Sequence, residues 1–134
     1  MAIQTSDAVA NARLDSIEVE LGTTPFLDFR TGAQPVNCAA ADAGSEIEHM
    51  ALPSDWMAAA SGRSKVKSGV WSSPADATGT AAHFRLKEVT DTTCHMQGSI
   101  TATGGGGDME LNNISISSGQ TITVDTFTLT DGNA

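Results

Sequence analysis

The apolar positions near the start of the chain repeat with the spacing of an α-helix. They are separated by four, three and four residues, which places them on one face of a helix of about four turns. The polar residues 5–7 offer an N-cap, and Gly22 offers a C-terminal stop. Such a short helix is marginal alone and is expected to pack on its own domain, on a neighbouring subunit or in a small helical bundle. The stripe consists of Ala10, Leu14, Ile17 and Leu21.

Beyond residue 22 the pattern changes to the two-residue alternation of β-strands. The sequence predicts strands over 26–30, 46–52, 65–71 and 81–89, with a loop at 72–80. In the 81–89 segment, Phe84 and Leu86 are expected on one face and Arg85 and Lys87 on the other.

The last third, from Cys94 to Leu129, consists of short alternating segments rich in Thr, Ser, Ile and Val, divided by glycine turns. The apolar parity switches near residues 125–126, which indicates a bulge or a bend. With seven or eight strands in all, we predict a mainly β fold: an N-terminal helical arm (1–22), then an antiparallel β-sandwich or jelly-roll domain (23–134).

Charge is distributed unevenly along the 134 residues. Residues 1–62 carry nine acidic and two basic side chains, residues 63–87 carry five basic and one acidic, and residues 88–134 carry six acidic and none basic. The formal net charge is −9. The basic middle segment either consists of solvated side chains on a loop or organises contacts with acidic surfaces of other molecules.

This composition excludes several function classes. Proteins that bind nucleic acids or anionic membranes need a basic surface, and this strongly acidic chain lacks one. We therefore expect neither as a partner. No apolar run is long enough to span a bilayer. The first residues lack a basic region followed by an apolar stretch, so we expect no signal peptide and synthesis in the cytoplasm.

The two cysteines, Cys38 and Cys94, leave two alternatives open: a disulfide or two buried free thiols. The cytoplasm disfavours the bond, whereas a particle released from the cell could acquire it.

No pattern of reactive residues predicts catalysis, a metal or a cofactor. His83, Cys94 and His95 are the nearest candidates, but neighbouring residues of a strand point to opposite faces and cannot share an ion without distortion. The glycines of residues 104–107 are followed by a strand and by no Lys-Ser or Lys-Thr pair, so we interpret them as a mobile hairpin loop rather than a phosphate loop. We therefore expect a protein that is not an enzyme.

The two tryptophans, Trp56 and Trp71, are the largest apolar side chains. Each is expected in the core or, as the alternative, at an interface, where such residues dominate the binding energy. The helix stripe is the other candidate contact, with sister copies or with a larger assembly.

Several stretches together resemble a family of small virion proteins of tailed bacteriophages. They are NARLDSIE at 11–18, RTG at 30–32, NCAAAD at 37–42, LPSDWM at 52–57, AHFRL at 82–86, CHMQG at 94–98, TATGGGGDM at 101–109 and FTLTDGNA at 127–134. The resemblance extends over nearly the whole chain and brings no catalytic residues.

The resemblance implies a structural protein on the phage particle, and capsid decoration is the placement that it favours. The implied partners are the major capsid protein and further copies of this chain, with a homotrimer at a local threefold axis as the economical arrangement. The implied location is the capsid surface of the virion, after synthesis in the cytoplasm of the host bacterium. The alternatives are a tail, collar or fibre component and an unrelated soluble enzyme or ligand-binding module.

Overall fold

The computed structural model describes residues 3–132, in which one helix precedes eleven strands. The helix α1 spans Asp7–Leu21. The strands are β1 (Phe26–Arg30), β2 (Glu46–Ala51), β3 (Ser64–Val66), β4 (Trp71–Pro74), β5 (Gly79–Thr80), β6 (His83–Lys87), β7 (Cys94–Ala102), β8 (Met109–Leu111), β9 (Ser115–Ile116), β10 (Thr121–Val124) and β11 (Thr128–Thr130). Residues 1–2 and 133–134, the outermost residues of the two predicted domains, lie outside the described part of the chain.

The predicted helix is confirmed, with both of its ends. The Ser6 hydroxyl accepts a hydrogen bond from the Val9 backbone N–H at 3.3 Å, which is the N-cap geometry. At the other end Gly22 has a φ of 74°, and its N–H donates to the Glu18 carbonyl at 2.8 Å. Glycine adopts this left-handed conformation without a steric penalty, so the helix stops where the sequence predicts.

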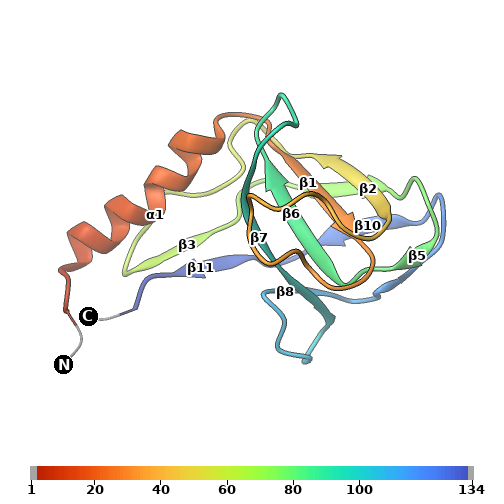
Figure 1. Ribbon diagram of the computed structural model, residues 1–134. Helices are drawn as coiled ribbons and strands as arrows, with labels where there is room; N and C mark the ends of the chain where they lie inside the picture. Colours follow the sequence, from red (N-terminus) through yellow and green to blue (C-terminus); the bar gives the residue numbers. More distant parts are fainter. Residues whose placement is uncertain (1–2, 133–134) are drawn as a thin grey trace.

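The mainly β fold is confirmed as well. A five-stranded sheet has the order β2-β1-β6-β7-β8, and three two-stranded ribbons pair β10 with β4, β11 with β3 and β5 with β9. The sheets curl into a half-barrel (Figure 1). All these pairs are antiparallel except β7 with β8, which run parallel and so differ from the purely antiparallel expectation.

The core fills the inside of this half-barrel and is connected by a row of aromatic rings. Trp56 and Trp71 lie 6.2 Å apart between ring centroids, Trp71 and Phe127 lie 5.6 Å apart, and Phe84 meets Phe127 edge to face at 5.7 Å. All four are buried. Aliphatic side chains of β1, β2 and β6, such as Leu27, fill the space around them.

Two predictions about the strands need correction. The predicted strand 65–71 is divided into β3 and β4, because Gly69 between them has a φ of 72° that strand residues do not adopt. The predicted loop 72–80 contains most of β4 and all of β5. The predicted bend near residues 125–126 is confirmed, since β10 ends at Val124 and the chain crosses from β4 to β3 before β11 begins.

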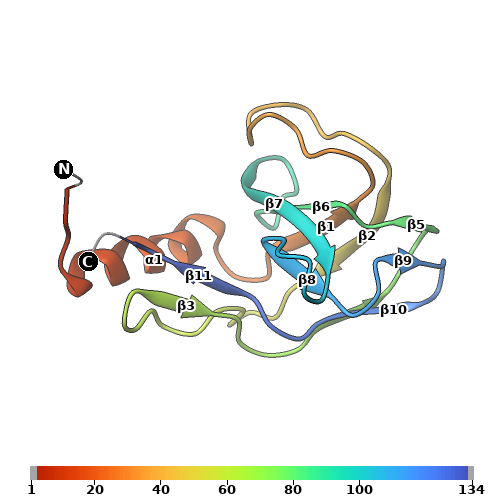
Figure 2. The ribbon, with the colours of Figure 1, turned by 90° about the horizontal axis from the view of Figure 1, so that it is seen from below.

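The helix lies beside the β3–β11 ribbon, and together these three elements extend to one side of the half-barrel (Figure 2). We call α1, β3 and β11 the arm. The last residue of the helix, Leu21, belongs to the core, and the Trp56 indole donates to the Gly22 carbonyl at 3.0 Å. The predicted boundary between residues 22 and 23 therefore runs through contacts that the helix shares with the β domain.

Candidate functional site

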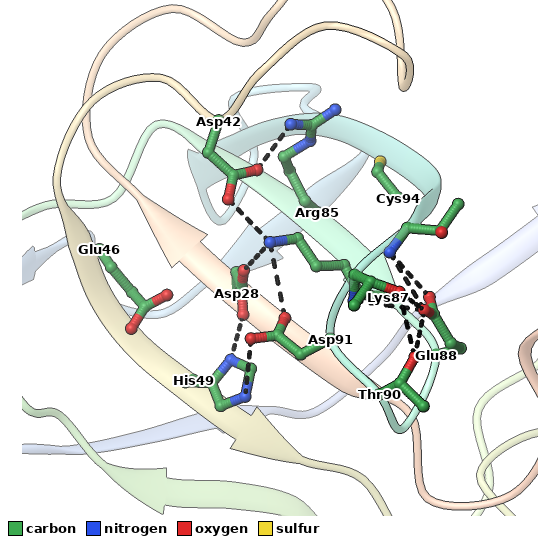
Figure 3. Close-up of polar contacts among 12 residues, drawn as sticks. Asp28, Asp42, Glu46, His49, Arg85, Lys87, Glu88, Thr90, Asp91 and Cys94 are labelled. Atoms are coloured by element: carbon green, nitrogen blue, oxygen red, sulfur yellow. Dashed lines mark hydrogen bonds and ion pairs between the residues drawn. The ribbon is translucent and has the colours of Figure 1, made fainter.

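Strand β6 carries charged side chains that are buried, which is unusual for such residues. All five of its residues are buried, including Arg85 and Lys87. Phe84 and Leu86 face the core, as predicted, but the opposite face of the strand is covered by the loop of residues 31–45 between β1 and β2. We call the charged residues in and beneath this loop the β6 ion cluster. Its members are Arg30 and, as labelled in Figure 3, Asp28, Asp42, Glu46, His49, Arg85, Lys87 and Asp91.

Lys87 lies at the centre of the β6 ion cluster. Its Nζ lies 2.7 Å from Asp42 Oδ2, 3.2 Å from Asp28 Oδ2 and 3.5 Å from Asp91 Oδ1. Burial by itself disfavours the ammonium form, but the hydrogen bond to Asp42 and the charge of Asp28 outweigh burial and raise the pKa of Lys87. Lys87 is therefore a buried cation at neutral pH.

Arg85 fastens the 31–45 loop to the sheet. Its guanidinium donates to the backbone carbonyls of Cys38 at 2.8 Å and Ala40 at 3.0 Å, and to Asp42 Oδ1 at 2.6 Å. Burial of Asp42 opposes its ionisation, but the hydrogen bonds from Lys87 and Arg85 outweigh burial and lower the pKa of this carboxyl. One carboxylate of the loop thus pairs with two buried cations of β6.

The base of the loop depends on a glycine. Gly44 has a φ of +67°, and a Cβ atom there would lie 1.8 Å from the Thr31 carbonyl oxygen. The Thr31 hydroxyl accepts a hydrogen bond from the Ser45 N–H at 2.9 Å, which holds the two ends of the loop together. Only glycine permits this close approach.

Asp28 is the deepest carboxylate of the cluster and is fully buried. In the sheet it stands between His49 of β2 and Arg85 of β6, which are its register partners. The His49 Nδ1 lies 2.5 Å from Asp28 Oδ1, and the His49 ring stacks on Phe26 at 4.0 Å between centroids. Asp28 is thus held by a histidine on one side and by the Lys87 ammonium on the other.

A metal interpretation of this cluster can be tested on its charges. One ligand atom each from Asp28, Glu46 and His49 lies within 4.8 Å of the others, a spacing that a divalent cation could bridge. However, Arg30 Nη1 lies 3.3 Å from Glu46 Oε2, and Lys87 occupies the other side of Asp28. The positions of positive charge are taken by side chains of the chain itself, so the arrangement works as an internal ion network.

The arm contains a second network, which we call the β3 ion cluster: Asp7, Arg13, Asp15, Glu18, Arg63, Lys65 and Asp131. The Lys65 Nζ is fully buried and lies 2.7 Å from Asp15 Oδ1 and 2.5 Å from Glu18 Oε2, both on α1. The hydrogen bond from Lys65 is the main cause that lowers the pKa of Asp15. These contacts attach the helix to β3.

Arg63 joins the two ends of the described chain. It donates to the backbone carbonyls of Thr5 and Asp131, at 2.9 Å in each case. Arg63 adopts a positive φ of 66°, which is uncommon for a residue with a side chain, and these contacts hold it there.

The structure shows the role of the basic side chains in residues 63–87, which the sequence left open. Arg63 and Lys65 bind the acidic helix, whereas Arg85 and Lys87 bind acidic residues of β1 and of the 31–45 loop. The segment therefore neutralises the first third of the same chain. Neither solvated loop side chains nor contacts with other molecules are needed to explain these four residues.

The candidate contact residues are likewise used inside the chain. Ala10, Leu14 and Leu21 are buried, and Ile17 is partly buried against the core. Trp56 and Trp71 are both in the core, exposed by 1% and 0%. Contact with another copy through these side chains would require α1 to leave β3 or the core to open, so we propose no interface through them.

The two cysteines come together, although they are 56 positions apart in the sequence. The Sγ atoms of Cys38 and Cys94 lie 2.8 Å from each other, and both residues are free thiols of intermediate exposure. They line a groove of about 360 Å³ with Arg85, Lys87 and Asp42. The side chains of His83 and His95, the other residues considered as metal ligands, have other partners: His83 Nδ1 is 2.9 Å from the Gly32 carbonyl, and His95 Nε2 is 3.6 Å from Glu88 Oε2.

Comparisons with known proteins give no relative: no protein-family profile, no curated protein and no solved structure matches the chain. Within residues 3–132, no helix has the length and apolar character required to cross a membrane.

Proposed function

We propose that this protein is a structural component of the virion of a tailed bacteriophage, and that it decorates the outside of the major capsid shell and stabilises it. It acts without catalysis, by occupying sites on the assembled shell. It is made in the host cytoplasm and works as a small homo-oligomer, with three copies around a local threefold axis.

The observation that carries this proposal is the use of the charged side chains. Six of the seven Lys and Arg residues form ion pairs with carboxylates of the same chain, and the remaining one, Lys67, donates to the Gly69 carbonyl. A protein that uses its cations to fix its own helix and loop presents a rigid, acidic body. Rigidity of this kind suits a protein that acts by filling a place in an assembly.

Two further observations support the same function. The resemblance to small virion proteins extends over nearly the whole chain and points to the phage particle. A decoration protein stabilises a shell because it binds assembled subunits better than free ones, and binding of this kind shifts the equilibrium towards the assembled state by mass action. A β-rich body with an attached arm offers edges and loops for such contacts.

The test is to measure the copy number and the effect of the protein on phage particles that encode it. Quantitative mass spectrometry of purified virions should find a copy number comparable to that of the major capsid protein. Heads assembled without the protein should release their genome at a lower temperature than complete heads. Adding back the purified protein should restore heat resistance, whereas a heat-unfolded sample of the same protein should not.

Three outcomes would contradict the proposal. A low copy number together with density below the portal would indicate a tail, collar or fibre component instead. Heads that lack the protein but keep full heat resistance would remove the stabilising role. Absence of the protein from purified particles would overturn the virion assignment itself.

A further inference from the structure

The proposed function makes no use of the two neighbouring cysteines, Cys38 in the 31–45 loop and Cys94 in β7. Bonded sulfur atoms of a disulfide lie about 2.05 Å apart, so the Cys38 and Cys94 sulfurs at 2.8 Å need to approach by less than about 1 Å. One sulfur comes from the loop and the other from the first residue of β7. A bond between them would join two segments that the backbone does not connect locally.

We propose that Cys38 and Cys94 are a covalent modification site: they form an intramolecular disulfide when the protein meets a small-molecule disulfide, and the bond locks the 31–45 loop onto β7. The chemical partner is a glutathione-type disulfide. The inference concerns the isolated chain and does not rest on the proposed function.

Buried contacts position the loop sulfur before any bond forms. Arg85 is 1% exposed, and its guanidinium donates to the carbonyl of Cys38 itself at 2.8 Å and to that of Ala40 at 3.0 Å. Asp42 adds the ion pairs with Arg85 and Lys87. Because β6 already fixes the backbone around Cys38, the entropy cost of bringing the sulfurs together is largely met in the reduced protein.

The exchange balances without a further reagent. One protein thiolate attacks the glutathione disulfide, forms a mixed disulfide and releases one glutathione thiolate. The second protein thiolate attacks the protein sulfur of this mixed disulfide and releases the other glutathione thiolate. The protein loses two protons and two electrons, and the two released thiolates carry them as two molecules of reduced glutathione. The groove of about 360 Å³ that both cysteines line is the route of approach.

The environment of Cys94 predicts the pH dependence of the rate. Burial is the main cause that raises the pKa of its thiol to about 11, with the neighbouring Cys38 adding to it, while Arg85 acts in the opposite direction. Only the thiolate exchanges, so the reaction should be slow at neutral pH and should accelerate about tenfold per pH unit up to the pKa of the attacking group.

The bond should change the loop measurably. It would close a long segment of chain, and loop-entropy arguments predict a Tm higher by roughly 10 °C in the oxidised protein. The backbone amides of residues 31–45 should exchange with solvent more slowly, whereas those of the arm should be unaffected.

The experiment uses the purified full-length chain, first reduced and then incubated with oxidised glutathione. Free thiols, intact mass and hydrogen exchange are followed over time. We expect both thiols to disappear, a mass lower by two hydrogens, a monomer on non-reducing gels and slower exchange in the 31–45 loop. Adding dithiothreitol should restore the free thiols, the original mass and the faster loop exchange, and the protein should stay monomeric throughout.

A matched variant tests whether position or flexibility brings the sulfurs together. Cys38→Ser combined with Ala39→Cys moves the loop thiol by one residue to an exposed position. This variant should stop at the mixed disulfide with glutathione. Equally fast ring closure in the variant would overturn the positioning argument. The intramolecular disulfide is contradicted if the wild type keeps free thiols, ends as glutathione adducts or forms disulfide-linked dimers. The claim that the bond restricts the 31–45 loop is contradicted if hydrogen exchange in the loop is unchanged after oxidation.

Discussion

The two buried lysines of this protein do similar work in different surroundings. Lys87 faces Asp28, which is fully buried, whereas Lys65 faces Asp15 and Glu18, whose side chains are 45% and 27% exposed. Both lysines hold an acidic segment from earlier in the chain against a strand. The difference teaches that the cost of losing a buried cation depends on whether its anionic partner can return to water.

The largest effect is expected from Lys87→Met. The substitution leaves the buried Asp28 carboxylate without its ammonium, and removal of one partner of a buried pair typically costs about 3–5 kcal/mol. We expect a loss of that size in the free energy of unfolding, measured by urea denaturation.

Two further variants control this prediction. Among the residues that the structure describes, the Lys67 ammonium pairs with no carboxylate; it donates to the Gly69 carbonyl and lies 5.7 Å from the Trp71 ring centroid. Lys67→Met should therefore change the free energy of unfolding by about 1 kcal/mol or less. Adding Asp28→Asn to Lys87→Met removes the buried carboxylate that lost its ammonium partner and should restore part of the stability. If Lys87→Met is as mild as Lys67→Met, the comparison between buried and solvated anions fails.

A smaller and local effect is expected from Lys65→Met. The carboxylates of Asp15 and Glu18 are partly exposed and can be solvated, so the loss should be about 1.5–3 kcal/mol, the value of charged hydrogen bonds. Hydrogen exchange should become faster in α1 and stay slow in β1 and β6. Equal acceleration in the arm and the half-barrel would show that the two regions unfold as one unit.

The smallest expected effect is a difference between the arm and the 31–45 loop in their stability at low pH. Asp15 in the arm has a lowered pKa, chiefly through its hydrogen bond from Lys65, so its contribution is present above the ordinary value of 3.8 and is lost as the pH falls through the folded-state pKa. In the β6 ion cluster the pKa of Asp42 is also lowered, so its contribution to stability is also lost on acidification. Burial raises the pKa of Glu46 in the same cluster, so protonation of Glu46 on acidification favours the folded state. We expect the arm to loosen before the loop.

The two tryptophan indoles provide the measurement. The Trp56 N–H donates to the Gly22 carbonyl at the end of α1, whereas the Trp71 N–H donates to the Ser68 carbonyl within the β domain. On acidification below pH 3.8, the Trp56 indole proton signal should shift or broaden before that of Trp71. Asp15→Asn should remove this early change, and simultaneous loss of both signals would contradict it.

The local features of the fold were predictable because short-range chemistry decides them. Ser6 and Gly22 mark the helix ends through their own backbone preferences, and the alternation in β6 places Phe84 and Leu86 in the core. The division of the 65–71 segment was missed because a single glycine, Gly69, breaks a pattern that otherwise continues.

The ion clusters could not be predicted in the same way. Arg85 meets Asp42 across 43 positions and Lys65 meets Asp15 across 50, and no local pattern specifies which acid such a cation will meet. The segregation of charge along the chain was the available signal. It left open whether the basic segment is solvated or contacts acidic surfaces of other molecules, and tertiary structure had to show that its partners lie chiefly in the first third of the same chain.

The β3 ion cluster also determines when the protein can finish folding during synthesis. Arg13 of the helix pairs with Asp131, a residue 118 positions later, and Arg63 contacts the Thr5 and Asp131 backbones together. The helix therefore emerges from the ribosome long before its last contacts exist. Without β11 the helix would lose its contacts with Asp131 and would be held through its contacts with Arg63 and Lys65.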